Sequence, residues 1–272
     1  MKDLKKYIKE GLFDDLDKRS EIGGLNAATE DIKKEICEWV INNTSDKIYE
    51  DKLKFDFNTN PISVDYNGNI TFKSDIQTLT DGSFQWGEVS GWFSCSRCES
   101  LTSLKGAPEK VGGFYCYYCK SLKSLEGAPK KVSGNFDCGG CISLKTLEGA
   151  PKKVGEGFYC YYCKSLTSLE GGPKEIGGDF DCRYCSSLET LEGAPKEVGG
   201  HFDCSRCKSL KSLEGAPKEI GWTFDCHNCK LLKSLEGAPE KTGRDFDCSW
   251  CGTKFTEEDV KKVSNVKNII FC

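Results

Sequence analysis

Eight pairs of cysteines, each with two residues between its members, are the groups in this chain whose type and spacing could support chemistry. The pairs are Cys95/Cys98, Cys116/Cys119, Cys138/Cys141, Cys160/Cys163, Cys182/Cys185, Cys204/Cys207, Cys226/Cys229 and Cys248/Cys251, and they recur every 22 residues after a first step of 21. Such cysteines could bind zinc, form disulfides, act as reactive thiols or fill a core as small apolar groups. A fixed period of this size also indicates stacked copies of one unit.

A four-cysteine zinc site is the main metal hypothesis, because Cys95, Cys98, Cys116 and Cys119 have suitable spacing. Zinc shared between repeats would group them in twos, and the sequence shows no such alternation. We also expect the cysteines of a pair to lie far apart, since the first follows an extended Phe-x-Cys step. We therefore predict reduced thiols that fill a core, without metal or cofactor. Zinc between adjacent repeats remains the alternative.

No group of residues in the sequence indicates catalysis. A nucleophilic cysteine needs a base, and the two histidines, His201 and His227, have no distinguishing acidic partner in the sequence. The chain has no Gly-rich phosphate loop and no nucleophile elbow. We predict that the protein is not an enzyme and has no catalytic residue.

Bulk composition narrows the possible partners and compartments. The net charge is −4, from 38 basic and 42 acidic side chains, so no nucleic acid partner is expected. The charged opening Met1–Lys6 does not resemble a signal peptide, and no apolar run is long enough to span a membrane. We expect a cytoplasmic protein with no membrane partner.

The repeating unit is Phe-x-Cys-x-x-Cys-x-x-Leu-x-x-Leu-Glu-Gly-Ala-Pro-x-x-Val-Gly-x-x, with one clear copy from Phe180 to Gly200. Its Phe-x-Cys step alternates as a strand does, while Gly-Ala-Pro and Gly-Gly prevent a helix of useful length. Stacked copies would place their strands side by side about 4.8 Å apart in a parallel sheet. The rest of each unit would return by an irregular or short extended path. This pattern predicts a β-solenoid.

The step from Phe180 through Cys182 and Cys185 to Leu188 resembles the leucine-rich repeat pattern Leu-x-Leu-x-x-Asn/Cys-x-x-Leu. The resemblance covers about residues 89–252, and it departs from the family where Val stands four residues before Phe. It implies a solenoid of about eight to nine coils whose outward strand positions form a binding face. The Leu-Glu-Gly-Ala-Pro sequence is similar to the repeats of certain bacterial and phage proteins. This resemblance implies that the chain is a bacterial or phage factor that recruits or blocks a host protein.

Both ends of the array are expected to carry caps, since a solenoid otherwise exposes its core. We divide the chain into an N-terminal helical segment 1–48, a strand and hairpin cap 49–88, the solenoid 89–252 and a C-terminal cap 253–272. The C-terminal cap should begin with a helix capped by Thr256 and end with a strand at 268–272. Residues 1–48 could instead form a separate docking segment.

Local signals refine the N-terminal α/β cap. An apolar helix face runs from Leu4 to Leu16, and Gly23-Gly24 should end that helix. A second helix is expected over 29–42, with Ile32, Ile36, Trp39 and Val40 on its buried side. Asn67-Gly68 predicts a hairpin turn. Ile70-x-Phe72 could form a degenerate first coil.

Function is expected where the copies differ, on the outward strand face. Two features mark this face: aromatic and arginine side chains, which dominate interface hot spots, and a column of aspartates. The predicted partner-binding residues are Trp92, Arg97, Tyr115, Tyr117, Tyr118, Asp137, Tyr159, Tyr161, Tyr162, Asp181, Arg183, Tyr184, Asp203, Arg206, Asp225, Asp247 and Trp250. We predict a non-enzymatic scaffold that binds a protein or peptide.

Three further expectations concern this face. Stacked aspartates repel one another, so a basic partner, cations or turn lysines should compensate them, unless they are merely turn-forming residues. Gly139-Gly140 should leave a gap between two tyrosine clusters, into which a side chain or small ligand could insert. His201 and His227 are interpreted as solvated outer residues.

Overall fold

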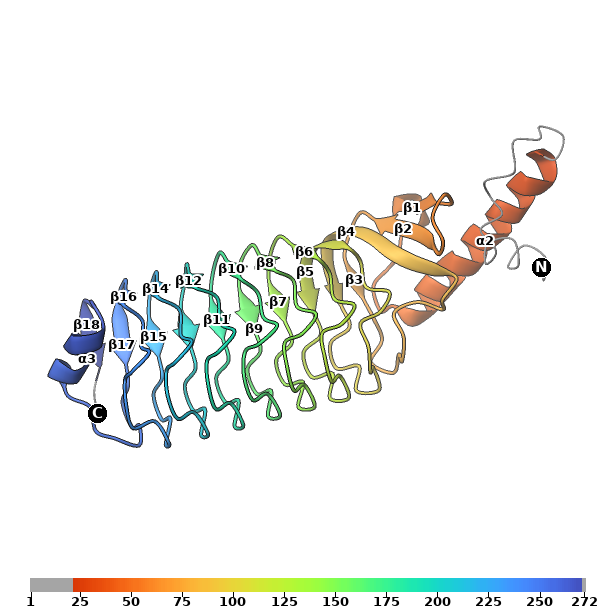
Figure 1. Ribbon diagram of the computed structural model, residues 1–272. Coiled ribbons are helices and arrows are strands. Elements are labelled where there is room, and N and C mark those ends of the chain that lie inside the picture. The colour runs from red at the N-terminus through yellow and green to blue at the C-terminus, as the bar shows by residue number, and fades with distance from the viewer. Residues whose placement is uncertain (1–21, 271–272) are drawn as a thin grey trace.

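The computed structural model describes residues 22–270, and these form an elongated parallel β-solenoid of about nine coils with a helix at each end (Figure 1). We number the coils one to eight by their cysteine pairs. No helix within this described range is long and apolar enough to cross a membrane. The predicted fold class is confirmed.

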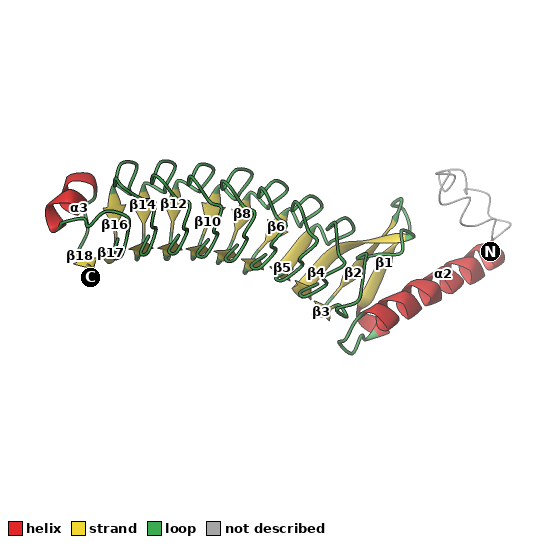
Figure 2. Cartoon of the chain, turned by 90° about the horizontal axis from the view of Figure 1, so that it is seen from below, coloured by secondary structure: helices red, strands yellow, loops and turns green. Residues whose placement is uncertain are grey.

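Coils three to eight each contribute two short strands to two parallel ladders, which Figure 2 shows side by side. The first ladder comprises β7 (Phe136–Asp137), β9 (Phe158–Tyr159), β11 (Phe180–Asp181), β13 (Phe202–Asp203), β15 (Phe224–Asp225) and β17 (Asp245–Asp247). The second comprises β6 (Lys131–Val132), β8 (Lys153–Val154), β10 (Glu175–Ile176), β12 (Glu197–Val198), β14 (Glu219–Ile220) and β16 (Lys241–Thr242). The longer β4 (Phe84–Ser94) and β5 (Lys110–Tyr115) run through both ladders.

Equivalent residues pair across neighbouring coils. Phe180 aligns with Phe158 on one side and Phe202 on the other, as the constant repeat length requires. The second ladder shows that the return path is the short extended one of the two that the sequence allowed. Its apolar residue, such as Val154 or Val198, is buried, and the lysine or glutamate before it is exposed. The two residues of each step therefore alternate as in a strand.

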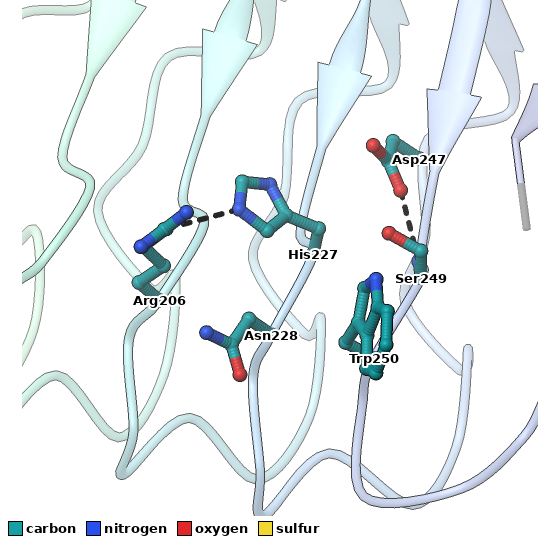
Figure 3. Close-up of a pocket in the computed structure, with 6 residues that line it drawn as sticks. All are labelled: Arg206, His227, Asn228, Asp247, Ser249 and Trp250. Carbon is teal, nitrogen blue, oxygen red and sulfur yellow. Dashed lines mark hydrogen bonds between the residues drawn. The ribbon is translucent and has the colours of Figure 1, made fainter. Parts of the chain in front are cut away.

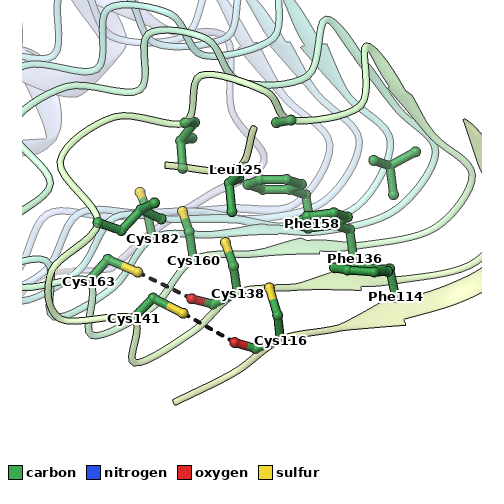
Figure 4. Close-up of a cluster of buried hydrophobic side chains, with 14 of the residues drawn as sticks. Phe114, Cys116, Leu125, Phe136, Cys138, Cys141, Phe158, Cys160, Cys163 and Cys182 are labelled. Carbon is green, nitrogen blue, oxygen red and sulfur yellow. Dashed lines mark hydrogen bonds between the residues drawn. The ribbon is translucent and has the colours of Figure 1, made fainter. Parts of the chain in front are cut away.

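Fully buried columns fill the solenoid. The phenylalanines of the first ladder stack ring on ring, with centroids 5.1 Å apart for Phe136 and Phe158 (Figure 4). The paired cysteines and the two leucines of each unit lie beside them, and Cys160, Cys163 and Leu166 have no exposed surface. Sulfur therefore fills space in the same layer as the leucines, as free cysteine commonly does.

The cysteines of a pair are close together, because each pair closes a tight turn. The Cys98 amide donates to the Cys95 carbonyl at 3.4 Å. The expectation that they lie far apart was wrong, because the residue before the second cysteine adopts a left-handed conformation and reverses the chain. Each second cysteine then donates its thiol to the coil before it, as from Cys163 to the Cys138 carbonyl at 3.3 Å (Figure 4). Burial raises the pKa of the Cys160 thiol well above its usual range.

Helix α2 (Ile22–Asn43) covers the open end of the first coils with its C-terminal half, and its N-terminal half extends beyond the array (Figures 1 and 2). Ile36 and Val40 are buried there, and the Trp39 ring lies edge-on to Phe84 at 5.5 Å. The predicted helix break at Gly23-Gly24 was wrong: both glycines lie within α2. Glycine weakens a helix by about 1 kcal/mol without forbidding it. The predicted helix face at Leu4–Leu16 lies outside the described residues.

The N-terminal hairpin forms earlier than predicted. After the short 3-10 turn η2 (Glu50–Lys52), β1 (Leu53–Asp56) pairs antiparallel with β2 (Ile62–Tyr66). Asn67-Gly68 instead forms a corner between β2 and β3 (Ile70–Thr71), which both pair parallel with β4. A corner and a hairpin use the same turn residues, so the local signal was ambiguous. Ile70 aligns with Phe93, which confirms the degenerate coil.

The C-terminal cap matches its prediction. Helix α3 (Glu257–Val263) begins with a capping box in which Thr256 and Asp259 each bond to the other's backbone amide. Strand β18 (Asn268–Ile270) then pairs parallel with β17 and extends the first ladder. Val260 is buried against the last coil. The described cap therefore covers apolar surface at this end of the array.

Candidate functional site

The second residue inside each cysteine pair lies in the left-handed backbone region. These residues are Arg97, Tyr118, Gly140, Tyr162, Tyr184, Arg206, Asn228 and Trp250, with φ between 55° for Tyr162 and 69° for Gly140. This region suits glycine and asparagine, and other residues incur roughly 1 kcal/mol or more there. Six of the eight positions nevertheless hold arginine, tyrosine or tryptophan. The left-handed backbone does not favour arginine, tyrosine or tryptophan, so the presence of these residue types needs an explanation other than backbone conformation.

These side chains stack along the array instead of standing apart. The Tyr162 and Tyr184 rings are parallel, with centroids 4.3 Å apart. The Arg206 guanidinium lies over the Tyr184 ring at 5.1 Å. We call this surface the aromatic–arginine face, and its members are Arg97, Tyr117, Tyr118, Tyr161, Tyr162, Arg183, Tyr184, Arg206 and Trp250.

The first residue inside each pair joins the same surface. Tyr117 meets Tyr118 edge-on at 5.9 Å, and Tyr161 meets Tyr162 at 6.1 Å. The Arg183 guanidinium lies 5.9 Å from the Tyr161 centroid. Tyrosine pairs within a coil thus combine with arginine–tyrosine contacts that cross from one coil to the next.

The expected gap at Gly139-Gly140 is filled. Both glycines are buried: the Tyr161 ring lies over Gly139 and the Tyr118 ring over Gly140, so a Cβ on either glycine would overlap a ring. The Tyr161 hydroxyl also donates to Asp137 Oδ2 at 3.3 Å. The absence of side chains at this coil draws neighbouring rings inward and makes the surface continuous.

The aspartate column shapes the cysteine turns. In each case the carboxylate accepts the amide hydrogen of the residue two positions later, which is an Asx turn. The bonds are Gly139 to Asp137 at 2.8 Å, Arg183 to Asp181 at 3.0 Å, and Ser205 to Asp203, His227 to Asp225 and Ser249 to Asp247 at 2.9 Å each. These aspartates therefore have a turn-forming role, whatever else they contact.

Neighbouring cations on the same face compensate part of the acidic column. Arg183 Nε lies 3.2 Å from Asp181, and its NH1 nitrogen lies 3.7 Å from Asp203. Burial, together with the Asp203 charge, raises the pKa of Asp181 to about 7. Burial also raises the pKa of Asp137 to about 6. These carboxyl groups take up protons near neutral pH, which reduces the repulsion that the sequence suggested.

The remaining predicted residues lie beside this face. Tyr115 and Tyr159 occupy the aspartate column in coils two and four, half-buried, with rings that lie back over Gly113 and Gly157. Trp92 is exposed in β4, just before the first phenylalanine of the array. Sequence reasoning missed exposed Trp222, which contacts His201 at 5.2 Å and Arg244 at 4.6 Å. The sequence feature that could have revealed it is a tryptophan at a variable position, two residues before Phe224.

A cavity of about 420 Å³ opens at the C-terminal end of the face, between coils six, seven and eight (Figure 3). It is lined by Arg206, His227, Asn228, Asp247, Ser249 and Trp250. His227 has an acidic partner after all, because its Nδ1 lies 2.8 Å from Asp225 Oδ1. The sequence could not show this contact between two residues of one turn.

In the described part of the chain, the one cluster of three side chains suited to a metal ion is Asp225, His227 and Asp247, with ligand atoms within 4.8 Å of one another. The cysteines of the described residues form no such cluster, and the second thiol of each pair donates to a backbone carbonyl. No protein-family model, curated protein or solved structure matches this chain, so the candidate site is supported by its geometry alone.

Proposed function

We propose that this chain is a non-enzymatic scaffold that binds a protein or peptide along the aromatic–arginine face. The observation that carries the proposal is the column of bulky side chains in left-handed backbone positions. Glycine would suit those positions better, so the stability of the fold does not account for tyrosine, arginine and tryptophan there.

The residue types support a protein or peptide partner. Tyrosine, tryptophan and arginine are enriched in interface hot spots, where they add large contact area with few rotatable bonds or with several donors. Mutual stacking, as between Tyr162 and Tyr184, holds such side chains in one conformation before a partner arrives. This lowers the entropy lost on binding.

The proposal also includes the cellular compartment in which the protein works. Seventeen cysteines in the described chain are free thiols, and all but Cys251 are buried. Free thiols in this number fit a reducing compartment, which we take to be a cytoplasm. The repeat sequence Leu-Glu-Gly-Ala-Pro is similar to repeats of bacterial and phage proteins. This similarity favours a bacterial or phage-infected cell as the setting in which the protein works.

Site-specific photo-cross-linking tests the proposal before the partner is known. A benzophenone amino acid would replace Tyr162 on the face or, as a matched control, Lys174 in the exposed turn between ladders. Irradiation in the source cells should give discrete adducts from position 162 that are absent from position 174. Equal adduct patterns at both positions, or adducts from position 174 alone, would contradict the proposed face.

A further inference from the structure

The cavity at the end of the aromatic–arginine face has one aromatic wall and one acidic wall. The Trp250 side chain is 63% exposed, more than any other large apolar residue in the described chain. Asp247, on the same coil, lies beside it, and the His227 ring faces both across the cavity (Figure 3). A ligand here would meet an indole and a carboxylate together.

Asp247 differs from the three aspartates that precede it in the column, Asp181, Asp203 and Asp225, in its charge environment. Asp181 and Asp203 lie near Arg183, and Asp225 lies near His227. No basic side chain in the described chain forms an ion pair with Asp247, which accepts the Ser249 amide at 2.9 Å. A negative charge without a counter-charge therefore lines the cavity.

The basic side chains around the cavity, Arg206 and Lys230, already have hydrogen-bond partners. Arg206 donates from Nε to His227 Nε2 at 3.1 Å (Figure 3). Its guanidinium also lies over the Tyr184 ring. Lys230 donates to the Trp250 carbonyl at 2.8 Å. Because Arg206 occupies Nε2, the neutral His227 ring carries its proton on Nδ1 and donates it to Asp225. These two contacts hold the ring in one orientation, as a flat wall of the cavity.

We propose that this cavity binds the guanidinium group of an arginine side chain on the partner, an inference that rests on the proposed function. A guanidinium stacks on an indole face and also donates several N–H bonds in one plane. In the proposed pose the plane lies against Trp250 and its N–H groups are directed to the Asp247 carboxylate, which lines the same cavity. The face would then hold an apolar segment along the tyrosines and one arginine at its C-terminal end.

Small probes test this site directly. The indole N–H signal of Trp250, assigned by comparison with Trp250→Phe, would be followed by NMR in the full chain. Acetyl-arginine amide should shift it in a saturable way, and acetyl-citrulline amide, which has nearly the same shape and no charge, should not. Asp247→Asn should weaken arginine binding about tenfold, since it removes a charge-assisted pair. It also preserves an acceptor for the Ser249 amide.

Asp203→Asn is the matched control, because it changes the equivalent turn two coils away and does not line the cavity. The inference is wrong if citrulline binds as well as arginine, if arginine leaves the Trp250 signal unmoved, or if the two substitutions weaken binding equally. It is also wrong if ZnCl₂ shifts the signal and arginine does not, since the Asp225, His227 and Asp247 cluster would then be a metal site. Failure here leaves the cross-linking result at Tyr162 unaffected, so the two proposals fail separately.

Discussion

Replacing Asp181 with asparagine should stabilise the solenoid at alkaline pH and have little effect at acidic pH. Burial and the neighbouring Asp203 raise the folded-state pKa of Asp181 from 3.8 to about 7. The folded state therefore holds this proton more tightly than the unfolded chain does. Its stabilising effect is present below pH 3.8 and is lost as pH rises through 7.

The structure sets the size of the effect. One pKa unit corresponds to about 1.4 kcal/mol, so a rise of roughly three units makes the ionised carboxylate up to about 4 kcal/mol unfavourable at pH 8. Asparagine still accepts the Arg183 amide hydrogen, now bonded to Asp181 at 3.0 Å. The attraction of the nearby Arg183 charge lowers this pKa and is therefore already included in the value of about 7. The expected gain at pH 8 is about 3–4 kcal/mol.

Urea unfolding of both proteins at pH 4.5 and pH 8, followed by circular dichroism, measures this difference. Comparing variant with wild type at each pH removes the contribution of all other titrating groups. A gain at pH 8 that falls to about 1 kcal/mol at pH 4.5, just above the unfolded pKa, is expected. A gain of the same size at both pH values, or a loss at pH 8, would refute the reasoning about burial.

Three other predictions concern the turns and the thiols. Gly140→Ala should lower the free energy of unfolding by about 2 kcal/mol or more, because the new Cβ would overlap the Tyr118 ring at a φ of 69°. Gly82→Ala is the control: its φ is 89° and the space around it is open, so it should lose only about 1 kcal/mol in the same urea assay. Arg97→Gly should raise stability by about 0.5–1 kcal/mol by relieving a left-handed residue; a loss of stability would show that its contact with Tyr117 outweighs the strain. Chelators should leave the Tm unchanged if thiols only fill space, and a fall of many degrees would support the zinc alternative.

The sequence predicted the first ladder and the core because the signals there repeat. Columns such as Phe180 and Leu188 recur at one spacing, and a recurring apolar residue must face the interior of a stack. The sequence left the second ladder open between an irregular and a short extended path, because Lys153–Val154 offers only two alternating residues. So short a step cannot be distinguished from a loop by its pattern.

The details of the face depended on contacts between coils. Tyr184 gives no local sign of a left-handed conformation, since that signal is ordinarily glycine or asparagine. Gly139-Gly140 looked empty because the rings that cover it belong to Tyr118 and Tyr161, one coil away on either side. Asp225 and His227 are two residues apart, yet only the tight turn brings their side chains together. Such contacts become visible once the stacking register is known.

The most direct test of the binding face uses the cross-linked partner once it has been purified. Its affinity would be measured for the wild type and for a variant that carries Tyr118→Gly, Tyr162→Gly and Tyr184→Gly together. The Tm of both proteins would be measured alongside. The account predicts that affinity falls at least a hundredfold while the Tm stays the same or rises, since glycine relieves three left-handed residues. Unchanged affinity would contradict the account. So would a Tm that falls together with the affinity, because the tyrosines would then serve the fold.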